Sequence, residues 1–194
     1  MQNKDNLIHF FSTLGERLKN HKSIIANDIS DALLATKTMP RSKKLKESPS
    51  NANFFKLLFE DKSNLMQLFV NCVDLLHWRQ AGFGKLPEKL SCQISVTELI
   101  GPDGIFENPN VRIGLLLQSP GIHYPRHWHS AEELYFIISG TANWAIGDEK
   151  ENPHAPGSFV HHASAQKHKM TTQSEPLLAL WGWTGDIGGT SYSI

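Results

Sequence analysis

Residues 121–140 read G-I-H-Y-P-R-H-W-H-S-A-E-E-L-Y-F-I-I-S-G and carry three potential metal ligands within seven positions. These are His127, His129 and Glu133. Imidazole nitrogens and a carboxylate in this combination suit a transition metal. The three residues and Tyr135 all have odd numbers, so their side chains share one face if the segment is extended. The pattern therefore predicts a sheet wall that carries a metal site with a phenol beside it.

The even-numbered neighbours Leu134, Phe136 and Ile138 are apolar and would point to the opposite face, into an apolar layer. Other short apolar segments are separated by turn-forming residues, and the segment 92–100 alternates apolar and polar residues as a half-buried strand does. Short strands at such intervals favour a sandwich or barrel. The further strand candidates are 111–118, 134–138, 142–146, 157–160 and 177–183.

The first eighty or so residues have a different pattern, because apolar residues there recur every three to four positions as in helices. A charged, proline-containing segment at 39–51 predicts a loop or linker. The helical pattern breaks again near residues 61–63, where Asp61 or Ser63 is expected to cap the next helix. We expect a helical N-terminal region at residues 1–84, packed on a metal-binding barrel at residues 85–194.

Composition narrows the function classes. The 194 residues suffice for one well-buried domain, and 19 Lys and Arg balance 19 Asp and Glu. This balance argues against nucleic acid or an anionic membrane as partner. Cys72 and Cys92 are the only cysteines, and no signal peptide or membrane span is recognisable, so a cytoplasmic location is expected.

The spacing G-x5-H-x-H-x3-E-x6-G from Gly121 to Gly140 resembles the first motif of the cupin superfamily, with every fixed position filled. This resemblance implies a mainly β fold, a double-sheet jelly-roll barrel. The second cupin motif, G-x5-P-x-G-x2-H-x3-N, is matched only in part. His168 follows Gly157 at the expected offset, but alanine and threonine replace the other fixed residues. His168 is therefore the preferred fourth ligand, with His161 and His162 as competitors.

The predicted metal ligands are thus His127, His129, Glu133 and His168. Such a set suits one divalent transition metal, which can be Fe, Mn, Zn, Ni or Co. The alternative is a hydrogen-bonded polar network in the core that binds no metal. His123 is expected at the pocket edge rather than among the ligands.

Tyr135 lies two residues after Glu133 and is expected to face the same cavity. A free phenol has a pKa of roughly 10, so it is a poor base at neutral pH. A neighbouring divalent cation favours the phenolate, which can then remove a proton. The alternative is a tyrosine packed in the barrel with its hydroxyl hydrogen-bonded.

Two stretches of the sequence are similar to motifs of the cupin-type dimethylsulfoniopropionate lyases. They are Y-P-R-H-W-H-S-A-E-E-L-Y at 124–135 and W-G-W-T-G-D-I at 181–187. The general layout, with helices before the barrel, matches over most of the chain, but the sharp motifs cover only about residues 121–140 and 181–187. The resemblance implies a carbon–sulfur lyase that splits dimethylsulfoniopropionate into dimethyl sulfide and acrylate. It also implies Tyr135 as base, the ligand set above, and Tyr124 as a residue that helps to hold substrate.

The chemistry is plausible from the residues alone. A metal bound to the substrate carboxylate would make the C2 proton more acidic, and its removal would allow neutral dimethyl sulfide to leave. The sulfonium needs a dry wall that tolerates cations, which aromatic faces provide. Trp181 and Trp183 share one face of a strand and are the preferred candidates, and core packing is the alternative.

Two other functions share this sequence pattern. One is an Fe(II) cupin dioxygenase that acts on a small thiol or acid and needs oxygen. The other is a non-enzymatic metal or ligand sensor whose helical part binds a partner. We expect instead a small-molecule substrate, no nucleic acid and no membrane, with the helices packed on the barrel or forming a homodimer contact.

Overall fold

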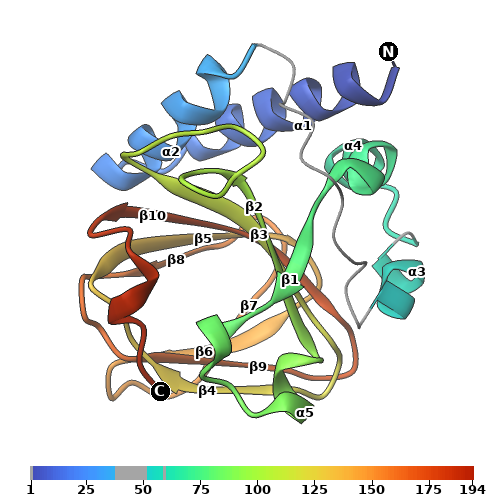
Figure 1. The fold of residues 1–194 in the computed structure, drawn as a ribbon. Helices are drawn as coiled ribbons and strands as arrows, with labels where there is room; N and C mark the ends of the chain where they lie inside the picture. Colours follow the sequence, from blue (N-terminus) through green and yellow to red (C-terminus); the bar gives the residue numbers. More distant parts are fainter. Residues whose placement is uncertain (1, 38–51, 59) are drawn as a thin grey trace.

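Two antiparallel sheets form the body of the protein in the computed structural model, which describes residues 2–37, 52–58 and 60–194 (Figure 1). One sheet has the strand order β1-β2-β3-β10-β5-β8 and the other β4-β9-β6-β7. The first sheet contains β1 (Trp78–Gln80), β2 (Ile94–Ile100), β3 (Arg112–Gln118), β10 (Leu177–Gly185), β5 (Ala131–Ser139) and β8 (Phe159–His162). The second contains β4 (His123–His127), β9 (His168–Thr172), β6 (Ala142–Ile146) and β7 (Asn152–His154).

Helices α1 (Gln2–Leu18) and α2 (Ile24–Ala35) lie across the outer side of the larger sheet (Figure 1). The shorter helices are α3 (Phe55–Leu58), α4 (Asn64–Cys72) and α5 (Glu88–Ser91). Ser63 caps α4, because its hydroxyl accepts a hydrogen bond from the amide of Met66 at 3.3 Å. Asp61 instead accepts from the amide of Ser63 at 2.8 Å, which orders the turn before the cap. The expected linker at 39–51 lies outside the described residues.

The strands of the larger sheet separate two apolar clusters. The helix-side core combines apolar side chains of α1, α2 and α4 with Leu134, Phe136 and Ile138 of β5 and Leu178 and Leu180 of β10. The cavity-side core lies between the sheets and includes Tyr124, Tyr135, Ile137, Trp144, Met170, Trp181 and Trp183. The predicted alternation along β5 is therefore confirmed.

Gly182 of β10 lets α2 approach the sheet closely. A Cβ atom built on this glycine would lie 2.2 Å from Cδ1 of Ile29, so no other residue fits without displacing that side chain. The glycine thus forms the docking point for the helix between two tryptophans that face the other way. Gly121 and Gly140, which frame the motif, have positive φ angles of 70° and 78° and turn the chain at either end of it.

The mainly β fold with N-terminal helices is confirmed, and three details differ from expectation. β2 was expected to be half buried, but all seven of its residues are buried because helices cover one face and the second sheet covers the other. The strand β1 lies within the span expected to be helical, where it pairs with β2. The strands β7 and β9 were not recognised. The division of the chain at residue 84 stays a prediction.

Candidate metal centre and active site

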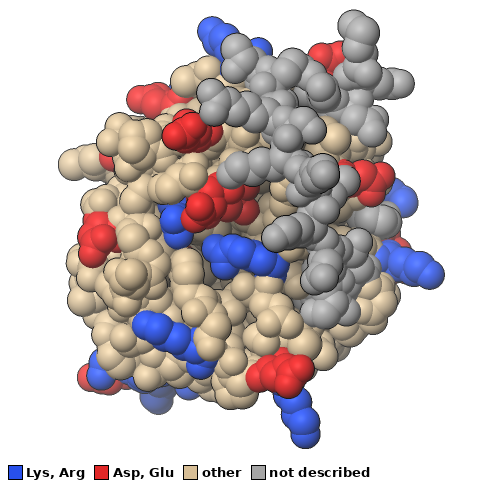
Figure 2. All heavy atoms as spheres, viewed as in Figure 1, with Lys and Arg blue, Asp and Glu red and all other residues tan. Residues whose placement is uncertain are grey.

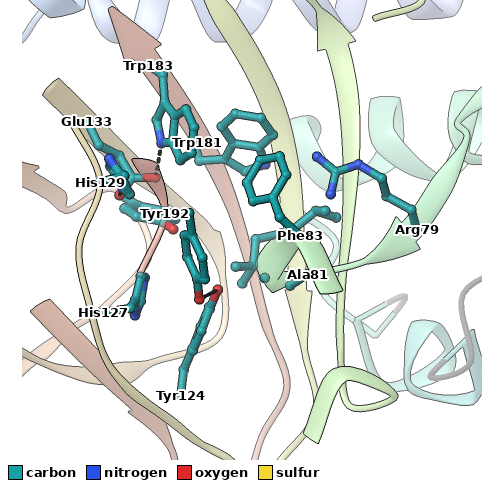
Figure 3. A pocket seen from close by; sticks show the side chains of 14 residues that line it. Arg79, Ala81, Phe83, Tyr124, His127, His129, Glu133, Trp181, Trp183 and Tyr192 are labelled. Carbon is teal, nitrogen blue, oxygen red and sulfur yellow. Dashed lines mark hydrogen bonds and ion pairs between the residues drawn. The ribbon is translucent and has the colours of Figure 1, made fainter. Parts of the chain in front are cut away.

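A cavity of about 410 Å³, its open mouth included, lies between the sheets (Figure 3). Glu133 and Tyr135 of β5 and Trp181 and Trp183 of β10 line it, because odd-numbered residues of both strands face inward. Four of the predicted site residues therefore meet in one space, although β5 and β10 are far apart in the chain.

Three potential ligands converge beside this cavity. The ligand atoms of His129, Glu133 and His168 all lie within 4.8 Å of one another, and each residue is at most 3% exposed. His129 follows the end of β4, Glu133 lies on β5 and His168 begins β9. Because the two sheets supply different ligands, the cluster exists only in the folded barrel.

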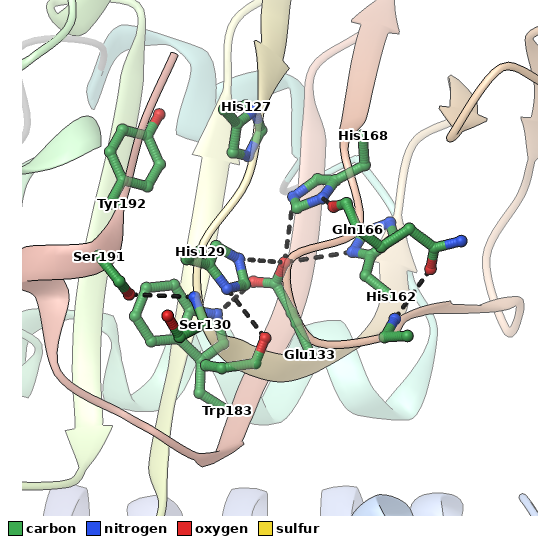
Figure 4. Close-up of polar contacts among 12 residues, drawn as sticks. His127, His129, Ser130, Glu133, His162, Gln166, His168, Trp183, Ser191 and Tyr192 are labelled. Atoms are coloured by element: carbon green, nitrogen blue, oxygen red, sulfur yellow. Dashed lines mark hydrogen bonds and ion pairs between the residues drawn. The ribbon is translucent and has the colours of Figure 1, made fainter.

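The carboxylate of Glu133 is the centre of this cluster (Figure 4). Its Oε2 lies 3.2 Å from Nε2 of His129 and 3.3 Å from Nε2 of His168. Nδ1 of His162 approaches the same oxygen to 3.2 Å. The other oxygen, Oε1, accepts a hydrogen bond of 2.6 Å from Nε1 of Trp183. Both oxygens are therefore held in fixed directions.

Hydrogen bonds to the backbone set the tautomers of three imidazoles. Each of His127, His129 and His168 donates its Nδ1–H to a carbonyl two residues away, which leaves Nε2 able to act as a ligand. The acceptors are the carbonyls of Pro125 at 2.8 Å, Ala131 at 3.1 Å and Gln166 at 2.8 Å. Such outer hydrogen bonds are typical of histidines that bind metals.

The buried Nε2 of His168 lies 3.3 Å from Oε2 of Glu133 but makes no hydrogen bond of acceptable geometry among the described residues. An unsatisfied buried polar atom costs about 1–3 kcal/mol, and its retention calls for an explanation. A cation bound among the three ligand atoms would satisfy this nitrogen. The residues present therefore fit a single metal ion.

Burial and charge act against each other on the ionisable groups of the cluster. Burial by itself would raise the pKa of Glu133, but the charge and hydrogen bond of His129 and the close approach of His162 and His168 hold it well below its usual value. Burial would lower the pKa of His129, and the Glu133 carboxylate reverses this so that the pKa is raised. Glu133 is thus ionised and able to bind a cation.

His127 lies beside the three converging ligands rather than among them. Its ring centroid is 4.1 Å from that of His168, and burial lowers its pKa well below the usual value, which keeps it neutral. The Tyr124 ring stacks on that of His127, with centroids 4.2 Å apart and an interplanar angle of 15°. As a neutral imidazole with a free Nε2, His127 remains a predicted ligand.

The two competitors for His168 have different surroundings. His161 is exposed and pairs with Oε1 of Glu132 at 2.7 Å, away from the cluster. His162 is fully buried and stacks on His168, with ring centroids 3.8 Å apart. His123 is exposed and contacts Thr171 on the next strand at 2.9 Å. Among the described residues, His162 is therefore the competitor that touches the cluster.

Tyr135 is buried and lies near Glu133. Burial raises the pKa of its phenol well above the usual value, and the charge on Glu133 raises it further. A phenolate at this position consequently needs a positive charge nearby. Tyr124 lines the same cavity, so both predicted tyrosines face it.

Comparison with known proteins assigns the family. Residues 21–179 match the dimethylsulfoniopropionate (DMSP) lyase family. The chain belongs to this family. Its name describes carbon–sulfur lyases, and the resemblance to cupin-type DMSP lyases that the motifs indicated is confirmed.

One curated relative is the DMSP lyase DddQ of Ruegeria pomeroyi DSS-3, which is 35% identical over 89 residues. This alignment covers 46% of the present chain and 44% of the relative, so it spans less than half of either protein. The crystal structure of DddQ from the same organism matches with a TM-score of 0.78 and 26% identity, over 99% of this chain and 95% of that chain. A structure described as DMSP lyases RdDddP and RnDddQII matches with a TM-score of 0.73 and 22% identity, over 99% and 98% of the two chains, which shows a shared fold.

Sequence reasoning missed three residues of this DMSP lyase family member, because Arg79, Phe83 and Tyr192 line the cavity. His162, which the sequence named as a competitor of His168, contacts Glu133. Tyr192 is one of only three tyrosines in the chain, and this rarity was a usable signal. Arg79 and Phe83 gave none, because their places depend on how β1 and the turn after it pack on the barrel.

The surface agrees with the balanced composition. On the face drawn in Figure 2, acidic and basic side chains of the described residues are interspersed with uncharged surface. Across the described parts of the chain, no helix combines the length and apolar character needed to cross a membrane. The structure describes one chain, so a homodimer contact stays a prediction.

Proposed function

We propose that this protein is a metal-dependent lyase that cleaves DMSP into dimethyl sulfide and acrylate by β-elimination, with Tyr135 as the base. The observation that carries the proposal is one cavity with two features. It borders on the convergent His129–Glu133–His168 cluster, and it is lined by Tyr135 on the same strand as Glu133. Family membership and the name of the Ruegeria relative supply the substrate.

We expect His129, Glu133 and His168 to hold one divalent transition metal, with His127 as the further ligand. Imidazole and carboxylate donors suit Fe, Mn, Zn, Ni or Co. When bound, such a cation would supply positive charge that polarises a carboxylate and favours a phenolate at Tyr135. Trp183 holds one oxygen of Glu133, which leaves the other oxygen to the histidines.

Tyr135 would remove a proton from C2, the carbon next to the substrate carboxylate. The electron pair released at C2 forms the new double bond to C3, and the C3–S bond breaks. Dimethyl sulfide leaves as a neutral molecule, and acrylate remains as the carboxylate product. Tyr135 then holds the proton and must release it before the next turnover.

The sulfonium end would lie against aromatic faces. Trp181 and Trp183 both line the cavity, and their rings meet edge to face with centroids 5.7 Å apart. Each favourable cation–π contact contributes about 0.5–2 kcal/mol. Tyr124 would help to hold the substrate from the opposite sheet.

The decisive experiment measures dimethyl sulfide in the headspace above purified protein supplied with DMSP. We expect release without oxygen, loss of release after treatment with a chelator, and recovery when a divalent transition metal is restored. Metal content measured on the same samples should fall and recover in parallel. Turnover that requires oxygen would favour a dioxygenase, and full turnover in metal-free protein would refute the metal-dependent mechanism.

A further inference from the structure

All three tyrosines of the chain line the same cavity. Tyr124 and Tyr135 belong to the motif, but Tyr192 comes from a separate segment at residues 188–194. In Figure 3 the hydroxyl groups of Tyr124 and Tyr192 meet at one side of the cavity. Tyr192 is 2% exposed, so its phenol belongs to the interior of the barrel rather than to the surface.

The segment that carries Tyr192 is fixed to the barrel on two sides. Ser193 forms an antiparallel bridge with Trp128, with backbone hydrogen bonds of 2.9 and 3.0 Å. Ser191 accepts a hydrogen bond of 3.0 Å from the amide of Ser130. From the other side, the ammonium group of Lys85 donates to the carbonyl of Tyr192. These contacts determine where the Tyr192 ring lies.

The two hydroxyl oxygens of Tyr124 and Tyr192 are 2.8 Å apart, which is a normal hydrogen-bond distance. A pair of hydroxyl groups has two hydrogens, and only one is used between them. Whichever residue donates, the second hydrogen has no acceptor among the described side chains. The pair therefore keeps one O–H available to a molecule in the cavity.

The position of the pair favours an anionic ligand group over a cationic one. The Tyr124 ring is stacked against His127, so one of its faces is already covered. The Tyr192 ring packs against Phe83 at 5.7 Å and against His127 at 5.4 Å. What the pair offers is hence its polar edge, next to a predicted metal ligand. An O–H donor complements a carboxylate oxygen, whereas a sulfonium has no acceptor for it.

We propose that Tyr192 is a positioning residue for substrate: it orients the Tyr124 hydroxyl, and the pair donates one hydrogen bond to a substrate carboxylate oxygen. This inference rests on the proposed function for the nature of the substrate. In the proposed arrangement Tyr192 donates its O–H to the Tyr124 oxygen, and the Tyr124 O–H reaches the ligand, so Tyr192 acts through Tyr124. The pair would stabilise the extra negative charge that reaches the carboxylate when C2 loses its proton.

The test uses Tyr124→Phe, Tyr192→Phe and the double variant, each of which removes only a hydroxyl. Calorimetry on metal-loaded protein measures binding of two probes, propionate with only the carboxylate and trimethylsulfonium with only the cation. Because Tyr124→Phe removes a hydrogen bond to a charged group, we expect it to bind propionate about 10- to 100-fold more weakly than the wild type does. We expect a loss of about 3- to 10-fold for Tyr192→Phe, the size of a bond between neutral groups.

In the double variant, propionate affinity should equal that of Tyr124→Phe alone, because in the proposed arrangement the Tyr192 hydroxyl affects the ligand only through Tyr124. Affinity for trimethylsulfonium and metal content should stay at wild-type values in all three. Ser193→Ala serves as the matched control, because it alters a side chain of the same segment without touching the hydroxyl pair, and it should leave propionate affinity unchanged.

Multiplicative losses in the double variant, weaker binding of trimethylsulfonium, or no measurable propionate binding to the wild type would overturn the inference. The binding of propionate can be measured whether or not the protein turns over DMSP. If the wild type released no dimethyl sulfide, the proposed function would be refuted, and the propionate measurements would still test the role of the tyrosine pair.

Discussion

Adjacent residues of β5 and β10 lie in two different environments. The side that faces the helices is built from apolar side chains such as Leu134 and Leu180. The side that faces the cavity carries Glu133 and two tryptophans, and Nε1 of Trp181 is buried there without a partner among the described residues. The same strands thus provide stability on one side and reactive polar groups on the other, as expected where function conflicts with packing.

The largest expected difference between the sides comes from Tyr135→Phe. The ring and its packing remain, but the proposed base is lost, so kcat should fall by about 10²- to 10⁴-fold. Metal content and melting temperature should be close to wild type, because no ligand and no apolar contact is removed. Headspace assays, metal analysis and thermal unfolding check these points, and a near wild-type rate would eliminate Tyr135 as base.

Leu134→Ala, one residue away, should have the opposite effect. Leu134 is fully buried in the helix-side core, and truncation of such a leucine costs about 2–5 kcal/mol of unfolding free energy. Turnover per folded molecule should stay near wild type, since the side chain points away from the cavity. Urea denaturation measures the loss of stability, and an activity assay well below the melting temperature measures turnover of the folded protein, so the two effects are distinguished. A large drop in kcat with unchanged stability would contradict the division between the sides.

Trp183→Phe tests the cavity side through the contact with Glu133. Loss of the 2.6 Å hydrogen bond to Oε1 should lower metal affinity or activity by about 10- to 100-fold, as for other partners of metal ligands. Trp78→Phe is a suitable control, because its Nε1 has no partner among the described residues and it lies in the helix-side core. Competition with a chelator measures metal affinity, and equal affinities for the two variants would argue against a role for this bond.

The smallest effect is expected for Gly182→Ala, on the opposite side of the same strand. The added methyl group would meet Cδ1 and Cγ1 of Ile29 at 2.2 and 2.8 Å. Because that side chain can shift, the cost should be about 1–2 kcal/mol, near the low end for overpacked cores. A second change, Ile29→Val, should recover part of the loss in thermal unfolding. No recovery would indicate that the backbone, and not this side chain, resists the methyl group.

Local spacing accounts for the parts of the site that the sequence predicted. Glu133 and Tyr135 face one cavity because alternate residues of β5 lie on the same side. His127 ends β4 in the other sheet and His129 lies between the two strands, so the prediction that one sheet wall carries all the ligands was wrong. The fold class followed from the same alternation and from the helical spacing near the N-terminus. These features depend on residues within about ten positions of one another.

The missed features depend on contacts between distant segments. Tyr192 meets Tyr124 only because Ser193 pairs with Trp128, and no periodicity encodes that pairing. β1 has three residues, too few to show an alternation. In β9 the buried positions include His168 and Thr172, so the alternation was hidden by polar side chains that the barrel nevertheless encloses.

The W-G-W sequence of β10 joins the outside of the molecule to its reactive centre. Ile29 of α2 packs directly against Gly182, and the next residue along the strand, Trp183, donates a hydrogen bond to Oε1 of Glu133. A displacement of α2 would therefore travel through one peptide unit to the carboxylate. Substitution of the buried Ile29 therefore offers a way to shift the Glu133 carboxylate without changing any residue of the His129–Glu133–His168 cluster.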